Sequence, residues 1–284
     1  RPVTLDADIG IALGASVGGM SSMQFALLEK GFHKATSPEG LIRYEKKVGD
    51  YSVPVDFLTD APPHTQGSAT VDDIVASVLP GINRALATAR TVKVTGADLA
   101  GNHQTATLRV CEVGPFLALK LRAFLHREQP KDVFDILYTL LHYDRGPAAA
   151  VAAFADEARA ENTACPDALL CLQRHFDSEA SLGPSKAAQF FPGPATPGEP
   201  ADLRFQRLQI QQEMVNAARL LNGGLPPRAT GKIQCPPTMN RIAFTVPALC
   251  LLMTGGKRGI ALKFHWVDLG NSSNLRPLNA EESL

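Results

Sequence analysis

The spacing of hydrophobic residues at the start of the chain predicts a strand followed by a helix. Residues 3–13 alternate and are rich in Val, Ile and Leu, which is typical of a strand. A glycine-rich turn follows, and apolar residues then recur at helical spacing over residues 20–28. Gly31 would end that helix because glycine readily adopts the backbone conformation found just past a helix C-terminus.

Two hairpins and another helix are expected before residue 112. The first hairpin would turn at Gly49 and Asp50, and the second would turn within residues 96–102. A helix is expected within residues 71–89, with an interruption or restart near Pro80 and Gly81. The expected hairpin strands are residues 42–46 with 51–58, and residues 91–95 with 105–111.

From Pro115 the pattern changes to helices. Pro115 and Pro130 suit the first turns of two helices that would run to about Glu128 and Tyr143. Residues 183–200 are dense in Gly and Pro and indicate a long loop. Further helices are expected over residues 148–161, 166–176 and 203–221.

These patterns together predict an α+β fold in which a small mixed-sheet lobe precedes a mainly helical lobe. We expect the α/β lobe to occupy residues 1–114 and the helical lobe residues 115–224. Residues 225–284 form a tail of uncertain structure, because they mix Pro, Gly and short apolar runs with no sustained period. The chain opens on Arg1 without a Met, so we expect its N-terminus to be truncated or processed.

Composition narrows the class of protein. Hydrophobic residues make up 45% of the 284, as in ordinary packed domains. Lys+Arg and Asp+Glu both number 28, so no global charge favours nucleic acid or an anionic membrane, and a polyanion site must be local. The five cysteines include no CxxC pair, which favours reduced thiols in a cytoplasmic protein over a disulfide framework or zinc site. No apolar run approaches the ~20 residues that cross a bilayer, so no membrane partner is expected.

Three aspartates are candidate metal ligands. Asp6 and Asp8 are two apart on a predicted strand, so their carboxylates project from the same face. Asp56 lies inside a second apolar strand, where an ionised group needs a partner or a metal. If the strands are neighbours, Asp6, Asp8 and Asp56 could bind the two Mg²⁺ ions of a phosphoryl-transfer site. The alternative is that these aspartates only face water.

A second group of charged residues lies on the first two predicted helices. Lys120 and Arg127 are seven apart and share a helix face, while Asp132 and Asp135 share a face of the next helix. With Arg122 and Lys131, the residues Lys120 and Arg127 form a local basic ridge that could contact RNA phosphates. The alternative is structural: Arg127 would pair with Asp132 or Asp135 and join the two helices, and acidic residues in a first turn favour the helix dipole.

Taken in order, these motifs resemble the AbiEii/AbiGii-type nucleotidyltransferase toxins of the DNA polymerase β-like superfamily. The resemblance covers roughly residues 1–145. It rests on Arg1-x-x-Thr4-x-Asp6-x-Asp8, on Val55-Asp56-Phe57-Leu58, and on Leu119-Lys120-x-x-Ala123 leading to Arg127-x-x-x-Lys131-Asp132-x-x-Asp135.

The resemblance implies transfer of a nucleotide from an NTP, with Mg²⁺, by a toxin that pairs with an antitoxin protein. Some members modify the 3′ end of tRNA. Asp6, Asp8 and Asp56 would hold the metals, and Asp56 would help deprotonate the acceptor hydroxyl. Lys120 would contact the triphosphate. Asp132, a further catalytic residue, would orient groups in the cleft between the lobes together with Asp135. The resemblance also implies that four residues bind the nucleotide: Lys120, Arg127, Lys131 and Asp135.

The family has a Gly-Ser or Gly-Gly turn upstream of its paired aspartates, where backbone N–H groups hold phosphates. This sequence begins at Arg1 and does not contain that turn before Asp6. Glycines follow the aspartates at residues 14–22 but do not replace it. The alternatives are therefore a non-catalytic relic that acts as a binding protein, or a metal-dependent phosphoesterase with similar carboxylates.

Overall fold

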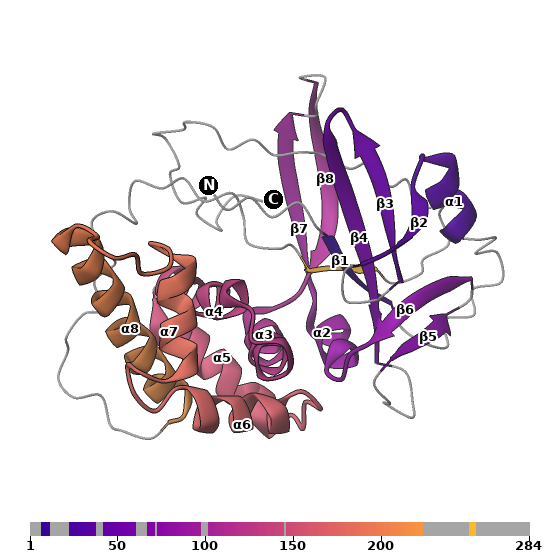
Figure 1. Cartoon of the computed structure of the whole chain (residues 1–284). Coiled ribbons are helices and arrows are strands. Elements are labelled where there is room, and N and C mark those ends of the chain that lie inside the picture. The colour runs from indigo at the N-terminus through magenta and orange to yellow at the C-terminus, as the bar shows by residue number, and fades with distance from the viewer. Residues whose placement is uncertain are drawn as a thin grey trace.

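A computed structural model of the chain describes residues 7–11, 23–37, 42–60, 67–71, 73–97, 102–144, 146–223 and 250–253. Over these residues, nine strands form one mixed sheet beside a group of helices (Figure 1). The strands are β1 (Ala7–Ile11), β2 (His33–Thr36), β3 (Ile42–Val48), β4 (Tyr51–Thr59), β5 (Ser68–Val71), β6 (Ile74–Val78), β7 (Arg90–Ala97), β8 (His103–Val110) and β9 (Cys250–Met253). The helices are α1 (Met23–Glu29), α2 (Ile82–Thr88), α3 (Val113–Arg127), α4 (Pro130–His142), α5 (Pro147–Arg159), α6 (Cys165–His175), α7 (Leu182–Phe190) and α8 (Ala201–Leu221).

The sheet is mixed because two antiparallel hairpins are joined through parallel strands at its centre. The main path runs β2-β3-β4-β1-β9-β8-β7, and β6 pairs with both β4 and β5. Strand β1 is parallel to β4 and to β9. The pairs β3–β4 and β7–β8 are antiparallel, as the two predicted hairpins require. The predicted α+β class, a mixed sheet followed by helices, is therefore confirmed.

Alternation along the central strands separates two faces of the sheet. Ile9 of β1 and Phe57 of β4 are buried in one cluster with Tyr44 of β3 and Leu27 of α1. The rings of Tyr44 and Phe57 meet edge to face, with centroids 5.6 Å apart. This cluster includes α1, so the charged residues that alternate with Ile9 and Phe57 project from the opposite face.

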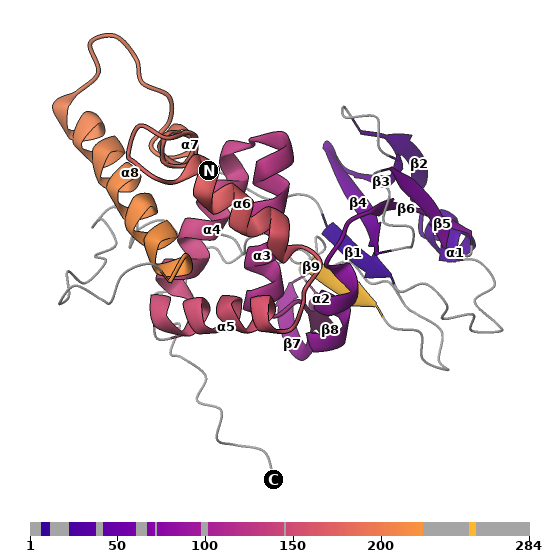
Figure 2. The same cartoon turned by 90° about the horizontal axis from the view of Figure 1, so that it is seen from below.

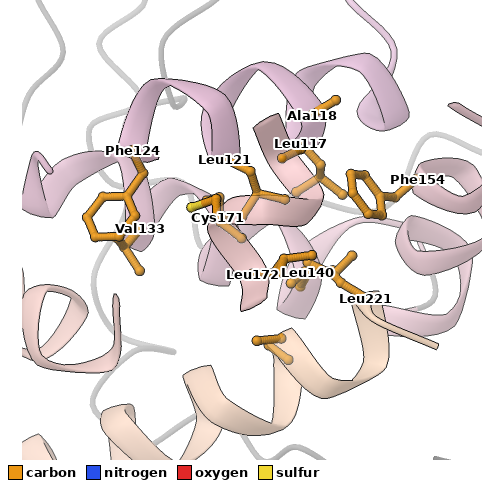
Figure 3. Packing of buried hydrophobic residues seen from close by; sticks show 14 of the residues in the cluster. Leu117, Ala118, Leu121, Phe124, Val133, Leu140, Phe154, Cys171, Leu172 and Leu221 are labelled. Carbon is orange, nitrogen blue, oxygen red and sulfur yellow. The ribbon is translucent and has the colours of Figure 1, made fainter. Parts of the chain in front are cut away.

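The helices share a second, larger core (Figure 3). Leu117 and Leu121 of α3, Leu140 of α4 and Phe154 of α5 are all buried in it. Helix α3 approaches α5 so closely that a Cβ on Gly114 would lie 2.5 Å from a backbone oxygen of α5. Helix α2 packs against β1, β4 and α3, and α2 and α3 lie where the helical region meets the sheet (Figure 2).

The helix predicted within residues 71–89 is wrong over its first half. Residues 74–78 form β6, and a helix begins only at Ile82. Val71, Ile74 and Val78 are spaced as on a helix face, whereas Ile74, Ala76 and Val78 alternate as on a strand, and the pairing of β6 with β4 and β5 decides between the two periods.

The loop predicted for residues 183–200 is wrong where α7 lies. Pro184 stands in the first turn of α7, where a helix tolerates proline. Gly183 is a packing residue, because a Cβ there would lie 2.2 Å from the ring of Phe176. Gly and Pro are typical of loops because they disrupt the interior of a helix, and this reason does not apply in the first turn of a packed helix.

The change from strands to helices falls between Val110 and Val113, close to the predicted boundary at residues 114–115. Whether the two parts are separate domains stays a prediction. Within the predicted tail, Cys250–Met253 forms a strand at the centre of the sheet, which the sequence pattern did not indicate. The rest of residues 225–284 lies outside the described residues.

Candidate active site

Asp8 of β1 and Asp56 of β4 lie opposite each other on neighbouring parallel strands. Residues in register on adjacent strands project from the same face, so the two carboxylates share one side of the sheet. Both residues are half-buried. The strand adjacency on which the predicted metal site depended is present. Asp6, the third residue of the predicted set, lies outside the described residues.

The face that carries these aspartates is the one toward the helices. Leu58 follows Asp56 by two residues on β4 and packs against the helical core. Residues two apart on a strand share a face, so Asp56 and its neighbour Asp8 are directed to the same side as Leu58.

Arg43 of β3 forms a two-pronged ion pair with Asp56. Its Nε lies 2.9 Å from Oδ1 and its Nη2 lies 2.5 Å from Oδ2. The side chains are 17% and 23% exposed, so the pair is largely removed from water. Sequence reasoning missed Arg43, although the two-residue turn between Val48 and Tyr51 places it across from Asp56 in the β3–β4 register.

Lys120 of α3 joins both acidic residues of α4. Its Nζ lies 2.8 Å from Asp135 Oδ2 and 3.3 Å from Asp132 Oδ1. Asp132 also accepts two hydrogen bonds from Arg127, at 2.7 and 2.6 Å. Lys131 Nζ lies 3.3 Å from Asp135. The structure therefore brings all five predicted residues of this group together, and the Arg127–Asp132 pair that the structural alternative expected is present.

This group has three cationic side chains for two carboxylates, so it carries one net positive charge. Lys120 is 11% exposed and Asp132 is 1% exposed, which makes the contacts between them strong and poorly screened. The Lys120 ammonium also lies 5.7 Å from the centre of the Phe116 ring.

The charges on α3 and on the sheet act on each other. Burial alone would lower the pKa of Lys120, but the charges of Asp135 and Asp132 outweigh it and hold the pKa above its ordinary value. Asp8 also raises the pKa of Lys120. Its contribution is smaller than those of Asp135 and Asp132, so the carboxylate on β1 acts on the ammonium of α3 only weakly.

Asp132 is held ionised by its partners. Burial favours the protonated form, but hydrogen bonds from Arg127 and the charge of Lys120 hold the pKa of Asp132 below its usual value. At neutral pH the carboxylate therefore stays charged and cannot act as a proton donor. Its direct role is to fix Lys120 and Arg127 in place.

The donor chemistry of the sheet residues fits a magnesium ion. Mg²⁺ prefers oxygen ligands and commonly takes one or two carboxylates from the protein, with water and phosphates completing its shell. Asp8 and Asp56 supply two such carboxylates in register. Across the part of the chain that the structure describes, no group of three or more His, Cys, Asp and Glu residues could hold a metal by itself.

Asp60, just past the end of β4, is a further buried carboxylate that the sequence did not single out. Its Oδ2 accepts hydrogen bonds from the backbone N–H groups of Gly81 (3.0 Å) and Asn83 (3.4 Å), at the start of α2. Thr163 Oγ1 lies 3.4 Å from the same oxygen. Asp60 therefore links the sheet to α2 and to the loop before α6, which is a structural role.

Comparison with known proteins provides no identification: no family model, no curated protein and no solved structure matches this chain. Among the described helices, none combines the length and apolar character needed to cross a bilayer.

Proposed function

We propose that this protein is a metal-dependent nucleotidyltransferase that moves a nucleotide from an NTP to an acceptor. One observation carries the proposal: Asp8 and Asp56 are in register on the sheet face that is directed toward the helices, where Lys120 of α3 contacts Asp132 and Asp135 of α4. Paired carboxylates can hold a divalent metal, and the cationic side chains of α3 and α4 can contact the triphosphate that the metal carries.

Each side chain has a defined part in this proposal. Asp8 and Asp56, with Asp6, would ligate two Mg²⁺ ions. When bound, these ions would neutralise charge on the attacked phosphate and its leaving group. Asp56 would accept the proton of the acceptor hydroxyl. Lys120 would bind the triphosphate as a point charge, positioned by Asp132 and Asp135.

The acceptor and partner are proposed from the resemblance to the AbiEii/AbiGii-type toxins. A cytoplasmic RNA, such as the 3′ end of a tRNA, is the proposed acceptor. A cognate antitoxin protein is the proposed partner.

A second candidate function is a non-catalytic binding protein that retains this fold. One observation favours it: the site charges are compensated by each other. Arg43 pairs with Asp56, and Lys120 pairs with Asp132 and Asp135. Such a network also occurs where charged residues serve only to hold elements together.

The fate of an NTP labelled on its α-phosphate distinguishes these functions. The full chain is incubated with the labelled NTP, Mg²⁺ and total tRNA or protein, and the products are separated. Metal-dependent label on an acceptor supports the transferase. Release of labelled monophosphate without transfer supports a phosphoesterase, and binding without any product supports the binding protein.

A matched pair of variants ties the result to the site. Asp8→Asn removes a proposed ligand and should abolish transfer, whereas Asp202→Asn changes an exposed aspartate on α8 and should leave transfer intact. Equal transfer by the wild type and Asp8→Asn would reject the assignment of Asp8.

A further inference from the structure

Arg43 occupies both oxygens of a carboxylate that the proposed function assigns to a metal. The bidentate contact uses Nε on Oδ1 and Nη2 on Oδ2, at 2.9 and 2.5 Å. Guanidinium–carboxylate pairs of this geometry are among the strongest charge-assisted hydrogen bonds in proteins. A divalent cation that binds Asp56 must therefore compete with a cation already in contact with it.

The backbone keeps Arg43 beside this site. Val48 and Tyr51 pair across the two-residue turn, and Tyr44 pairs with Val55, so the next residues in that register are Arg43 and Asp56. Strand β3 lies between β2 and β4 in the sheet. The paired strands therefore hold the Cα of Arg43 next to Asp56. Only a rotation of the Arg43 side chain is needed for the guanidinium to release Asp56.

We propose that Arg43 is a resident cation that competes with divalent metal for Asp56 and couples metal binding to nucleotide binding. This inference rests on the proposed function and deepens it. A free divalent ion gains Asp8 and Asp56 but meets the repulsion of the guanidinium. A metal–NTP complex also brings phosphate oxygens, which accept the same bidentate hydrogen bonds and give the displaced Arg43 a new partner.

Mn²⁺ alone should therefore bind weakly, and Mn²⁺ with nucleotide should bind much more tightly. Because coupling between two ligands is reciprocal, removal of Arg43 should strengthen the binding of Mn²⁺ alone and weaken its dependence on nucleotide. A charge within a few ångström commonly shifts an ionic equilibrium by one or more powers of ten, so the expected gain for Mn²⁺ alone is about tenfold or more.

The test is a titration of the full chain with Mn²⁺, in which free Mn²⁺ is measured by electron paramagnetic resonance. It is run alone and with an ATP analogue that cannot be cleaved between its α- and β-phosphates. Arg43→Gln removes the cation. Arg43→Lys keeps the charge without the bidentate contact and should show a smaller gain, and it also serves if Arg43→Gln fails to fold.

Arg90→Gln is the matched control for net charge. Arg90 lies on β7 in an exposed pair with Glu112, 3.5 Å away, and its loss should leave Mn²⁺ affinity unchanged. Equal Mn²⁺ affinity in the wild type, Arg43→Gln and Arg43→Lys would overturn the competition while leaving the metal site standing. Absence of Mn²⁺ binding in every chain, with and without nucleotide, would overturn the proposed function as well.

Discussion

Lys120 Nζ lies 2.8 Å from Asp135 Oδ2, and this pair joins α3 to α4. The same ammonium contacts Asp132 at 3.3 Å. Both carboxylates are buried, so Lys120 has a structural role as their shared cation. A catalytic role would be additional to this structural one.

Replacing Lys120 with Met should destabilise the fold by about 3 kcal/mol, because two buried carboxylates would lose a shared cation. Lys131→Met is the matched control, since Lys131 contacts only Asp135 among these carboxylates and is 34% exposed. That variant should cost under about 1 kcal/mol. Urea denaturation measures both, and equal losses would show that burial of Lys120 contributes nothing.

Arg127→Gln should lower the free energy of unfolding by about 1–2 kcal/mol at pH 7, because Asp132 loses two charge-assisted hydrogen bonds. The partners hold the pKa of Asp132 below its ordinary value of 3.8 in the folded state. Their stabilisation is therefore complete above pH 3.8 and is lost as the pH falls through the lowered value. Urea titrations from pH 7 downward should show a constant gap above pH 3.8 and convergence of the two proteins only in stronger acid. A gap that already narrows between pH 7 and pH 5 would contradict this account.

Glu213 of α8 should make the protein less stable as the pH rises. Its Oε2 is buried and has no hydrogen-bond partner among the described residues, and burial raises its pKa to about 7 from 4.5. Between these values the folded state holds a proton that the unfolded chain releases, so stability falls with rising pH. Glu213→Gln should gain ~2 kcal/mol over the wild type at pH 8 and little at pH 5. A gain that is the same at both pH values would exclude titration of Glu213 as its cause.

Gly81→Ala should cost about 1–3 kcal/mol more than Gly49→Ala, because only the first adds a clash to an unfavourable backbone. Both glycines have positive φ, at 100° and 59°. A Cβ on Gly81 would lie 2.7 Å from the Cβ of Ala164, whereas nothing lies within 4 Å of one on Gly49. Thermal unfolding of both variants measures the difference. Similar losses would mean that the region around Ala164 yields to the added methyl group.

Local sequence signals predicted the elements whose ends are marked by turn residues or by prolines. The turn at Gly49 and Asp50 and the prolines at 115 and 130 mark the ends of strands and helices whatever they pack against. Strand β6 was misjudged because its pairing with β4 is a tertiary effect. Helix α7 was predicted as a loop because Gly183 is typical of loops. In the structure Gly183 packs against the ring of Phe176, and the sequence does not indicate this contact.

The charged site was partly predictable for the same reason. Spacing predicted that Lys120 and Arg127 share a face of one helix, but not that Lys120 contacts Asp132 on the next helix. Asp8 and Asp56 meet because their strands, which are far apart in the chain, pair in parallel. The sequence predicted this pairing only on the assumption that the aspartates share a metal. Arg43 could have been found by counting back from the turn, because that turn fixes the hairpin register.

The proposed metal site requires Asp8 and Asp56 to act together, and a double-mutant cycle in nucleotide transfer tests this most directly. Transfer of labelled nucleotide is measured for the wild type, Asp8→Asn, Asp56→Asn and the double variant at saturating Mg²⁺. Residues that act as one unit are non-additive, so each single change should reduce transfer by roughly a hundredfold or more and the double should be no worse. Undiminished transfer by either single variant, or losses that simply multiply in the double variant, would contradict a shared metal site.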